Sequence, residues 1–154
     1  MGIISVPKKV YIATVSAEGD TPLNAFDNCL VKAGLGNVSL IKVTSVLPPK
    51  IKILEKPPRY PPGSNVPSIY AYTISSEPGS IISAAVALAP TENLTLVAEH
   101  TAIGKEEKQV QEEVIEIVKE MARSRNLKIE NIIVKSVAHK VEKVGCALVV
   151  VAQM

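Results

Sequence analysis

The segment at residues 40–49, LIKVTSVLPP, constrains the fold of this chain more than any other stretch, because it reads as a buried strand that stops abruptly. Ile41 and Val43 are β-branched and apolar, which suits a pleated and largely buried strand. The two prolines at its end stop the strand, since proline has no N–H to donate and holds the residue before it extended. Ser45 lies just before this stop. A hydroxyl at a rigid strand end is well placed for chemistry, but a serine there also commonly hydrogen-bonds its own backbone, and the segment alone leaves both readings open.

Apolar periodicity and turn residues predict the other elements. Thr21 followed by Pro22 is typical of a helix start, and apolar residues at spacings of three and four follow. The alanine-rich segment 81–89 fits a helix or a strand, and its short span between Gly79 and Pro90 favours a strand. We therefore expect helices over residues 22–33 and 105–124, and strands over residues 9–15, 37–46, 68–75, 81–89, 94–100, 129–142 and 144–152.

Residues 50–67 contain five prolines, and this composition predicts a long irregular connection. A long loop inside a compact domain is often functional or lies at an interface. It can equally be a stiff spacer on the surface, and the composition favours neither reading.

The length of 154 residues predicts a single domain over residues 1–154. Hydrophobic residues make up 47% of the chain and charged residues 21%, so a well-buried core is expected. Strand segments outnumber helices, and both helices are amphipathic. This pattern predicts an α+β fold in which sheets pack face to face with helices on their outer sides.

Charge and histidine spacing argue against two classes of partner. The 17 basic side chains are interspersed with 15 acidic ones, giving a net charge of +2, and no basic stripe with interleaved aromatic residues suggests nucleic-acid binding. His100 and His139 are the only histidines, and neither has a second ligand at a spacing typical of metal sites. We therefore expect no nucleic acid and no metal.

The cysteines and the apolar runs bear on the compartment. Cys29 and Cys146 are far apart in the sequence and form no CxxC pair, so we interpret each as a small buried thiol. No apolar run approaches the roughly 18 residues of a membrane span, and the N-terminus lacks a signal-peptide pattern. These observations favour a cytoplasmic protein with no membrane partner. Composition and spacing lead no further than a domain with a hydroxyl at a strand end.

Several longer runs, in order, resemble the pyruvoyl-dependent arginine decarboxylases. They are GDTPLNAFD at residues 19–27, AGLGNVSLI at 33–41 and TSVLPP at 44–49. Shorter matches follow at residues 66–67, 70–72, 78–79, 82–85 and 141–147. Each piece is weak, but together they cover nearly the whole chain.

The resemblance implies a self-processing precursor. Ser45 Oγ would attack the Thr44 carbonyl and turn the peptide bond into an ester. β-Elimination would then release residues 1–44, and a covalent pyruvoyl group derived from Ser45 would head residues 45–154. Its ketone is the cofactor that draws electrons from the substrate as CO2 leaves.

The resemblance also assigns roles to individual side chains. Glu99 matches the acid that returns a proton to the α-carbon of the substrate, although its strand-end position is also ordinary for a carboxylate. Asp27 matches the carboxylate that binds the substrate guanidinium through paired hydrogen bonds, although an exposed helix carboxylate is the plain alternative. The remaining substrate-binding positions implied are Asn24, Leu30, Gly36 and Val38.

Two positions depart from the family pattern. Thr44 replaces a serine that often precedes the reactive serine, which should be tolerated because position 44 contributes its carbonyl. Ser39 stands where an asparagine commonly stabilises the oxyanion during cleavage. Ser39 can still donate a hydrogen bond, and Asn37 is a nearby substitute.

The family architecture implies a four-layer αββα sandwich, mostly antiparallel, with homotrimers or dimers of trimers whose active sites lie between subunits. The implied reaction is decarboxylation of L-arginine to agmatine and CO2, the first step of a polyamine route. Two alternatives stay open: the same machinery acting on another amino acid, and an unprocessed, non-catalytic oligomeric binding protein.

Overall fold

A computed structural model describes residues 4–154, which form two helices and nine strands. In chain order these are β1 (Lys9–Gly19), α1 (Pro22–Lys32), β2 (Ser39–Lys42), β3 (Val46–Leu47), β4 (Lys52–Leu54), β5 (Asn65–Ser75), β6 (Ile81–Pro90), β7 (Thr95–Ile103), α2 (Glu107–Ser124), β8 (Ile133–Lys140) and β9 (Val144–Gln153). Within the described residues, neither helix combines the length and the apolar character needed to cross a membrane.

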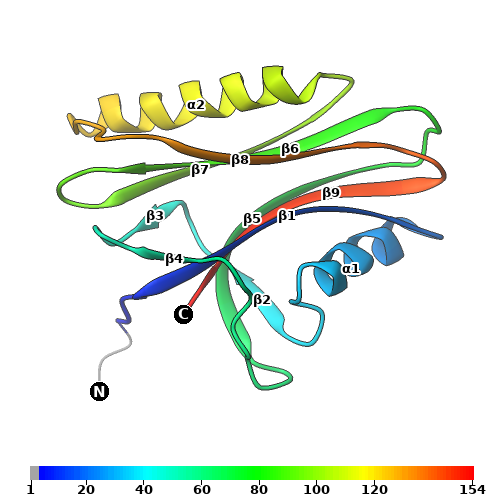
Figure 1. Ribbon diagram of the computed structural model, residues 1–154, viewed down its shortest axis with the longest axis horizontal. Helices are drawn as coiled ribbons and strands as arrows, with labels where there is room; N and C mark the ends of the chain where they lie inside the picture. Colours follow the sequence, from blue (N-terminus) through cyan, green and yellow to red (C-terminus); the bar gives the residue numbers. More distant parts are fainter. Residues whose placement is uncertain (1–3) are drawn as a thin grey trace.

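The strands form two sheets that lie face to face, with one helix outside each (Figure 1). The five-stranded sheet has the order β2-β5-β9-β1-β4, and the four-stranded sheet has the order β3-β7-β6-β8. Among the strands of residues 4–154, the β1–β4 and β2–β5 pairs are parallel and the other pairs are antiparallel. Helix α1 covers the five-stranded sheet and α2 covers the four-stranded sheet. The predicted α+β sandwich with outer helices is therefore confirmed.

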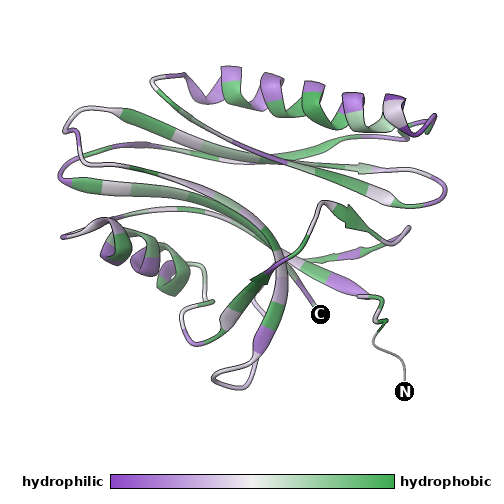
Figure 2. Ribbon diagram, turned by 180° about the vertical axis from the view of Figure 1, so that it is seen from behind, coloured by the Kyte–Doolittle hydropathy of each residue, from purple (hydrophilic) through white to green (hydrophobic). Residues whose placement is uncertain are grey.

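Three apolar clusters hold the four layers together. One lies between the sheets, one between α1 and the five-stranded sheet, and one between α2 and the four-stranded sheet. Figure 2 shows long hydrophobic stretches in the strands and both hydrophilic and hydrophobic residues along α2. Strand β9 is buried from Val144 to Ala152 because it packs against the other sheet on one face and α1 on the other. The alternation of a strand between its two faces places Val149 in the first cluster and Leu148 in the second.

Local sequence explains where α1 begins and which face α2 buries. The Thr21 hydroxyl accepts a hydrogen bond from the Asn24 N–H at 3.1 Å, and Pro22 follows at the first helical position of α1. In α2 the buried residues recur every four positions, as expected for a single apolar stripe: Val110, Val114, Val118 and Ala122.

The predicted strand over residues 37–46 is wrong as a single element. Strand β2 ends at Lys42 in one sheet, and β3 begins at Val46 in the other. Between them the backbone changes partners: the Val43 N–H donates to the Ser68 carbonyl of β5, whereas the Ser45 carbonyl accepts from the Val97 N–H of β7, both at 3.0 Å. The segment is therefore a crossover between sheets, and Ser45 lies within it.

The prediction that residues 50–67 hold no regular structure is wrong at both ends. Strand β4 pairs in parallel with β1, and β5 begins at Asn65 and includes Pro67. Proline is tolerated there because the antiparallel pairing of β5 with β9 starts only at Ser68. Residues 81–89 lie in strand β6, as predicted. The strand predicted over residues 129–142 is shorter, since β8 runs from Ile133 to Lys140.

Candidate active site

Ser45 lies in the crossover between the sheets, with its side chain against β7. Its hydroxyl donates to the Glu99 carboxylate, at 3.0 Å from Oε2 and 3.2 Å from Oε1. Ser45 is half-buried. The structure therefore brings together the two residues that the family resemblance placed at the centre of the chemistry.

The register of β7 explains why Glu99 faces Ser45. Side chains alternate along a strand: Val97 belongs to the core between the sheets, whereas Ala98 packs under α2. Glu99 therefore points to the same side as Val97, and Val46 pairs with Leu96 next to it. His100 lies on the opposite side, where its Nε2 is 3.7 Å from the Glu113 carboxylate of α2.

The backbone around Ser45 is also constrained. The Val46 N–H donates to the Thr44 carbonyl oxygen at 3.1 Å, which closes a three-residue turn centred on Ser45. The hydroxyl of Ser45 and the carbonyl that precedes it are thus each held by a separate partner. Such an arrangement suits an intramolecular attack, because that step requires fixed geometry.

Ser39 and Asn37 lie at the far end of β2 from this turn. Ser39 is the first residue of β2, and its N–H donates to the Ser64 carbonyl at 2.8 Å. Asn37 precedes the strand, and its carbonyl accepts from the Gly63 N–H at 2.7 Å. In this chain, β2 therefore separates both residues from Thr44.

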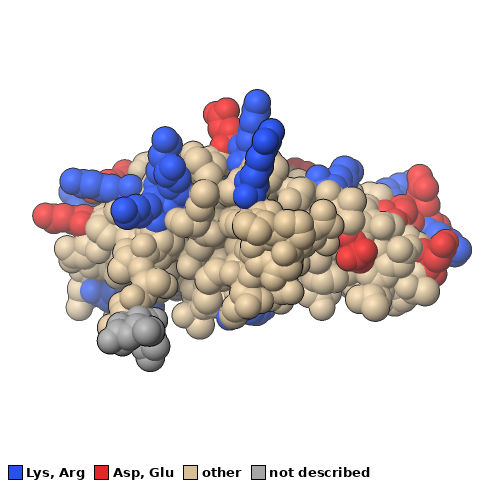
Figure 3. Space-filling view, turned by 90° about the horizontal axis from the view of Figure 1, so that it is seen from below, with Lys and Arg blue, Asp and Glu red and all other residues tan. Residues whose placement is uncertain are grey.

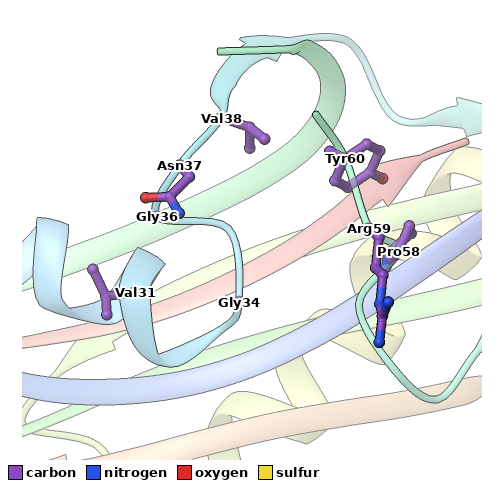
Figure 4. Close-up of a pocket in the computed structure, with 8 residues that line it drawn as sticks. All are labelled: Val31, Gly34, Gly36, Asn37, Val38, Pro58, Arg59 and Tyr60. Atoms are coloured by element: carbon purple, nitrogen blue, oxygen red, sulfur yellow. The ribbon is translucent and has the colours of Figure 1, made fainter. Parts of the chain in front are cut away.

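Gly36 and Val38 line a surface pocket of about 310 Å³ between the α1–β2 connection and the proline-rich loop (Figure 4). Sequence reasoning missed Arg59 and Tyr60, which line the same pocket from the loop. The Tyr60 hydroxyl donates to the Gln153 carbonyl at 2.9 Å and so fastens the loop to the end of β9. The available sequence signal was that these two polar residues stand between two Pro-Pro pairs in the segment PPRYPP at residues 57–62.

Asp27 and Asn24 line a different pocket, of about 370 Å³, with Thr21 and Leu23 at the start of α1. Asp27 is exposed and half-buried Leu30 packs toward the sheet. Asp27 lies one helical turn before Val31, which lines the pocket of Gly36, so the two pockets are neighbours along one face of α1. Neither pocket is lined by Ser45 or Glu99.

A carboxylate clamp fixes the corner where β1 leads into α1. Glu18 Oε2 lies 2.5 Å from His139 Nε2, and Glu18 Oε1 accepts from the Lys143 N–H at 2.7 Å. Burial raises the pKa of Glu18, but hydrogen bonds from His139 and from the backbone at Lys143 and Glu142 outweigh it, and the net pKa is lowered. Gly145 makes room for the clamp, since a Cβ there would lie 2.6 Å from Glu18 Oε2.

Within the part of the chain that the structure describes, metal ligands are not gathered. Among residues 4–154 no group of three or more histidine, cysteine, aspartate or glutamate side chains is arranged to hold a metal ion. The chemistry available at Ser45 is that of a hydroxyl, a carboxylate and a polarised carbonyl.

Comparison with known proteins identifies the family. The family model for pyruvoyl-dependent arginine decarboxylase matches residues 9–154. The chain belongs to this family. Curated pyruvoyl-dependent arginine decarboxylases align with it over most of their length. The protein of Methanothermobacter thermautotrophicus is 42% identical over 140 residues, which are 91% of this chain and 92% of that protein.

Two further relatives show the same extent of similarity. The pyruvoyl-dependent arginine decarboxylase of Methanocaldococcus jannaschii is 39% identical over 151 residues, 96% of this chain and 90% of that protein. The protein of the same name from Thermococcus kodakarensis is 37% identical over 152 residues, 97% of this chain and 96% of that protein. Membership of this family implies a pyruvoyl prosthetic group.

Proposed function

We propose that this protein is a pyruvoyl-dependent arginine decarboxylase that converts L-arginine into agmatine and CO2 and serves polyamine synthesis. The observation that carries the proposal is the hydrogen bond from Ser45 to Glu99 at a break between the two sheets. It joins the residue from which the cofactor would be made to the acid that the reaction requires.

The pyruvoyl group would arise from Ser45 by self-cleavage. Ser45 Oγ bonds to the Thr44 carbonyl carbon, its proton passes to Glu99, and the C–N bond breaks to leave an ester. The proton on Glu99 passes to the released Ser45 amine. β-Elimination then removes the Cα proton of residue 45 to solvent as the Cβ–Oγ bond breaks and the Thr44 carboxylate is freed. Hydrolysis of the dehydroalanine left at position 45 releases ammonia and leaves the pyruvoyl group. The fragments 1–44 and 45–154 stay together because β1 pairs with β9 from Val10 to Gly19.

In the decarboxylation itself, the pyruvoyl ketone supplies the electron sink, and the side chains supply binding and protons. Glu99 holds the proton that returns to the substrate α-carbon. Asp27 accepts paired hydrogen bonds from the guanidinium, with Asn24 and Leu30 from the same helix beside it. Gly36 and Val38 bound the neighbouring pocket.

The separation of Asp27 from Ser45 within one chain supports an active site shared between subunits. Leu23 and Val31 flank Asp27 on the outer face of α1 and are 75% and 61% exposed. Exposed apolar side chains that share one face of a helix are common where a partner binds. Figure 3 shows that the face on the α1 side is largely free of charge at its centre, with Lys and Arg along one border. A homotrimer, or a dimer of trimers, would bring Asp27 of one subunit to Ser45 of the next.

An end-product assay tests the proposal. The purified protein should release CO2 and agmatine from L-arginine in equal amounts, and Ser45→Ala should release neither. Aspartate, histidine and lysine are assayed in parallel as alternative substrates. Turnover of one of these in place of arginine would reassign the specificity, and no turnover of any would contradict the enzymatic proposal.

A further inference from the structure

The turn around Ser45 has a defined shape. The 3.1 Å hydrogen bond from the Val46 N–H to the Thr44 oxygen spans two residues, as in a γ-turn. Among the described residues, the non-glycine residues with positive φ are Lys50 and Asn126, so Ser45 has a negative φ. The turn is therefore of the inverse type, whose central residue lies near φ of about −75° and ψ of about +65°.

Both sheets hold this turn in place. On one side the Val43 N–H is bound to the Ser68 carbonyl, and on the other the Ser45 carbonyl accepts from the Val97 N–H. Leu47, which follows the turn, is 2% exposed in the core between the sheets. The Val46 N–H therefore cannot turn away from the Thr44 oxygen without moving groups that the core anchors.

The position of this N–H matters for the self-cleavage proposed above, on which the present inference rests. As Ser45 Oγ adds to the Thr44 carbonyl carbon, negative charge develops on the Thr44 oxygen. A donor that already points at this oxygen stabilises the charge without reorganisation, which is the main requirement of an oxyanion site. We propose that the backbone N–H of Val46 is the oxyanion donor for cleavage of the Thr44–Ser45 bond.

The proton balance of the step uses only groups at the turn. Ser45 Oγ forms a bond to carbon and loses its proton to Glu99, 3.0 Å away. The charged Thr44 oxygen is held by Val46 until the C–N bond breaks, and the proton on Glu99 then goes to the released Ser45 amine. The donor is a main-chain group, so it does not depend on the residue at position 39, where Ser39 replaces the family asparagine.

An amide-to-ester replacement removes this donor and leaves every side chain in place. Incorporating α-hydroxyvaline at position 46 by nonsense suppression replaces the N–H with an oxygen. α-Hydroxyleucine at position 47 is the matched control, because it removes the next amide along. We expect the cleavage rate between 44 and 45, followed by denatured intact mass, to fall about 10²- to 10³-fold at position 46, as on loss of one oxyanion donor. The control should cleave at the parent rate.

A position-46 ester that cleaves as fast as the parent would overturn the inference. Val46→Pro is a second variant without the N–H, and Val46→Ala keeps the N–H while shortening the side chain. Thermal melting identifies which variants are folded, and cleavage rates are compared among those. Loss of cleavage in Ser39→Ala with normal cleavage of the position-46 ester would assign the donor to Ser39 instead. A parent protein that never cleaves would contradict the proposed function itself, so the two failures are distinguishable.

Discussion

The Ser45 hydroxyl oxygen lies 3.0 Å from Glu99 Oε2 although 54 positions separate the residues in the chain. The contact depends on the pairing of β3 with β7, which sets Val46 opposite Leu96. The short strand β3, which follows the crossover from one sheet to the other, thus places a hydroxyl beside a carboxylate.

Glu99→Gln should impair both steps in which we propose that this carboxylate acts. The amide keeps the shape but neither takes the Ser45 proton nor returns one to the substrate, so we expect self-cleavage and decarboxylation each to slow about 10²- to 10⁴-fold. Cleavage is followed by mass and decarboxylation by agmatine release. His100→Gln is the control, because the neighbouring side chain faces α2. Full activity in Glu99→Gln would show that neither step requires the carboxylate.

Asp27→Asn should weaken substrate binding without affecting cleavage. Loss of a charged, two-bond contact to the guanidinium is expected to lower kcat/KM about 10- to 100-fold, mainly through KM. Asp20→Asn provides a control from the same corner of α1, because Asp20 is exposed and paired with Lys143 at 2.9 Å, where ion pairs contribute little. Equal effects of the two substitutions would argue against a specific role for Asp27.

The clamp between Glu18 and His139 should make stability depend on pH in the acid range. The pKa of Glu18 is lowered in the folded protein, so the unfolded chain binds its proton more readily. The stabilisation is therefore complete above the usual glutamate pKa and is lost as pH falls through the lower, folded value. Melting temperatures measured from neutral to acid pH should show this loss in the parent protein and a smaller loss in Glu18→Gln.

A double-mutant cycle tests whether Glu18 and His139 stabilise the fold through their contact with each other. Glu18→Gln and His139→Gln should each lower the melting temperature at neutral pH. The melting temperature of the double variant should fall by less than the sum of the two single decreases, since the stability effects of residues in contact are not additive. Additive losses would show that the two side chains act independently.

Local patterns in the sequence were sufficient for the helices and for most of the long strands. The Thr21 cap with Pro22 placed the start of α1 correctly, and apolar periodicity predicted an amphipathic helix over residues 105–124, where α2 lies. Both features depend on residues that are close in the sequence, so local patterns are enough to predict them.

The crossover at residues 43–45 was not predictable in this way. Both Val43 and Val46 are β-branched and apolar, so they suit one strand as well as two. What separates them is a change of partner from Ser68 to Val97, and such long-range pairing has no local signature. Arg59 and Tyr60 stand out locally as a polar pair between two Pro-Pro steps, but their place in the pocket of Gly36 is a long-range contact that this local signal does not give. The Ser45–Glu99 contact was approached only through the family resemblance.

The denatured intact mass of the purified protein tests the central claim most directly. The account predicts two species: residues 1–44 ending in Thr44, and residues 45–154 with a blocked pyruvoyl N-terminus. The pyruvoyl species should react with a carbonyl reagent and disappear in Ser45→Ala, which should remain a single chain. A parent protein that stays one chain of 16.4 kDa, with no reactive carbonyl, would contradict the account.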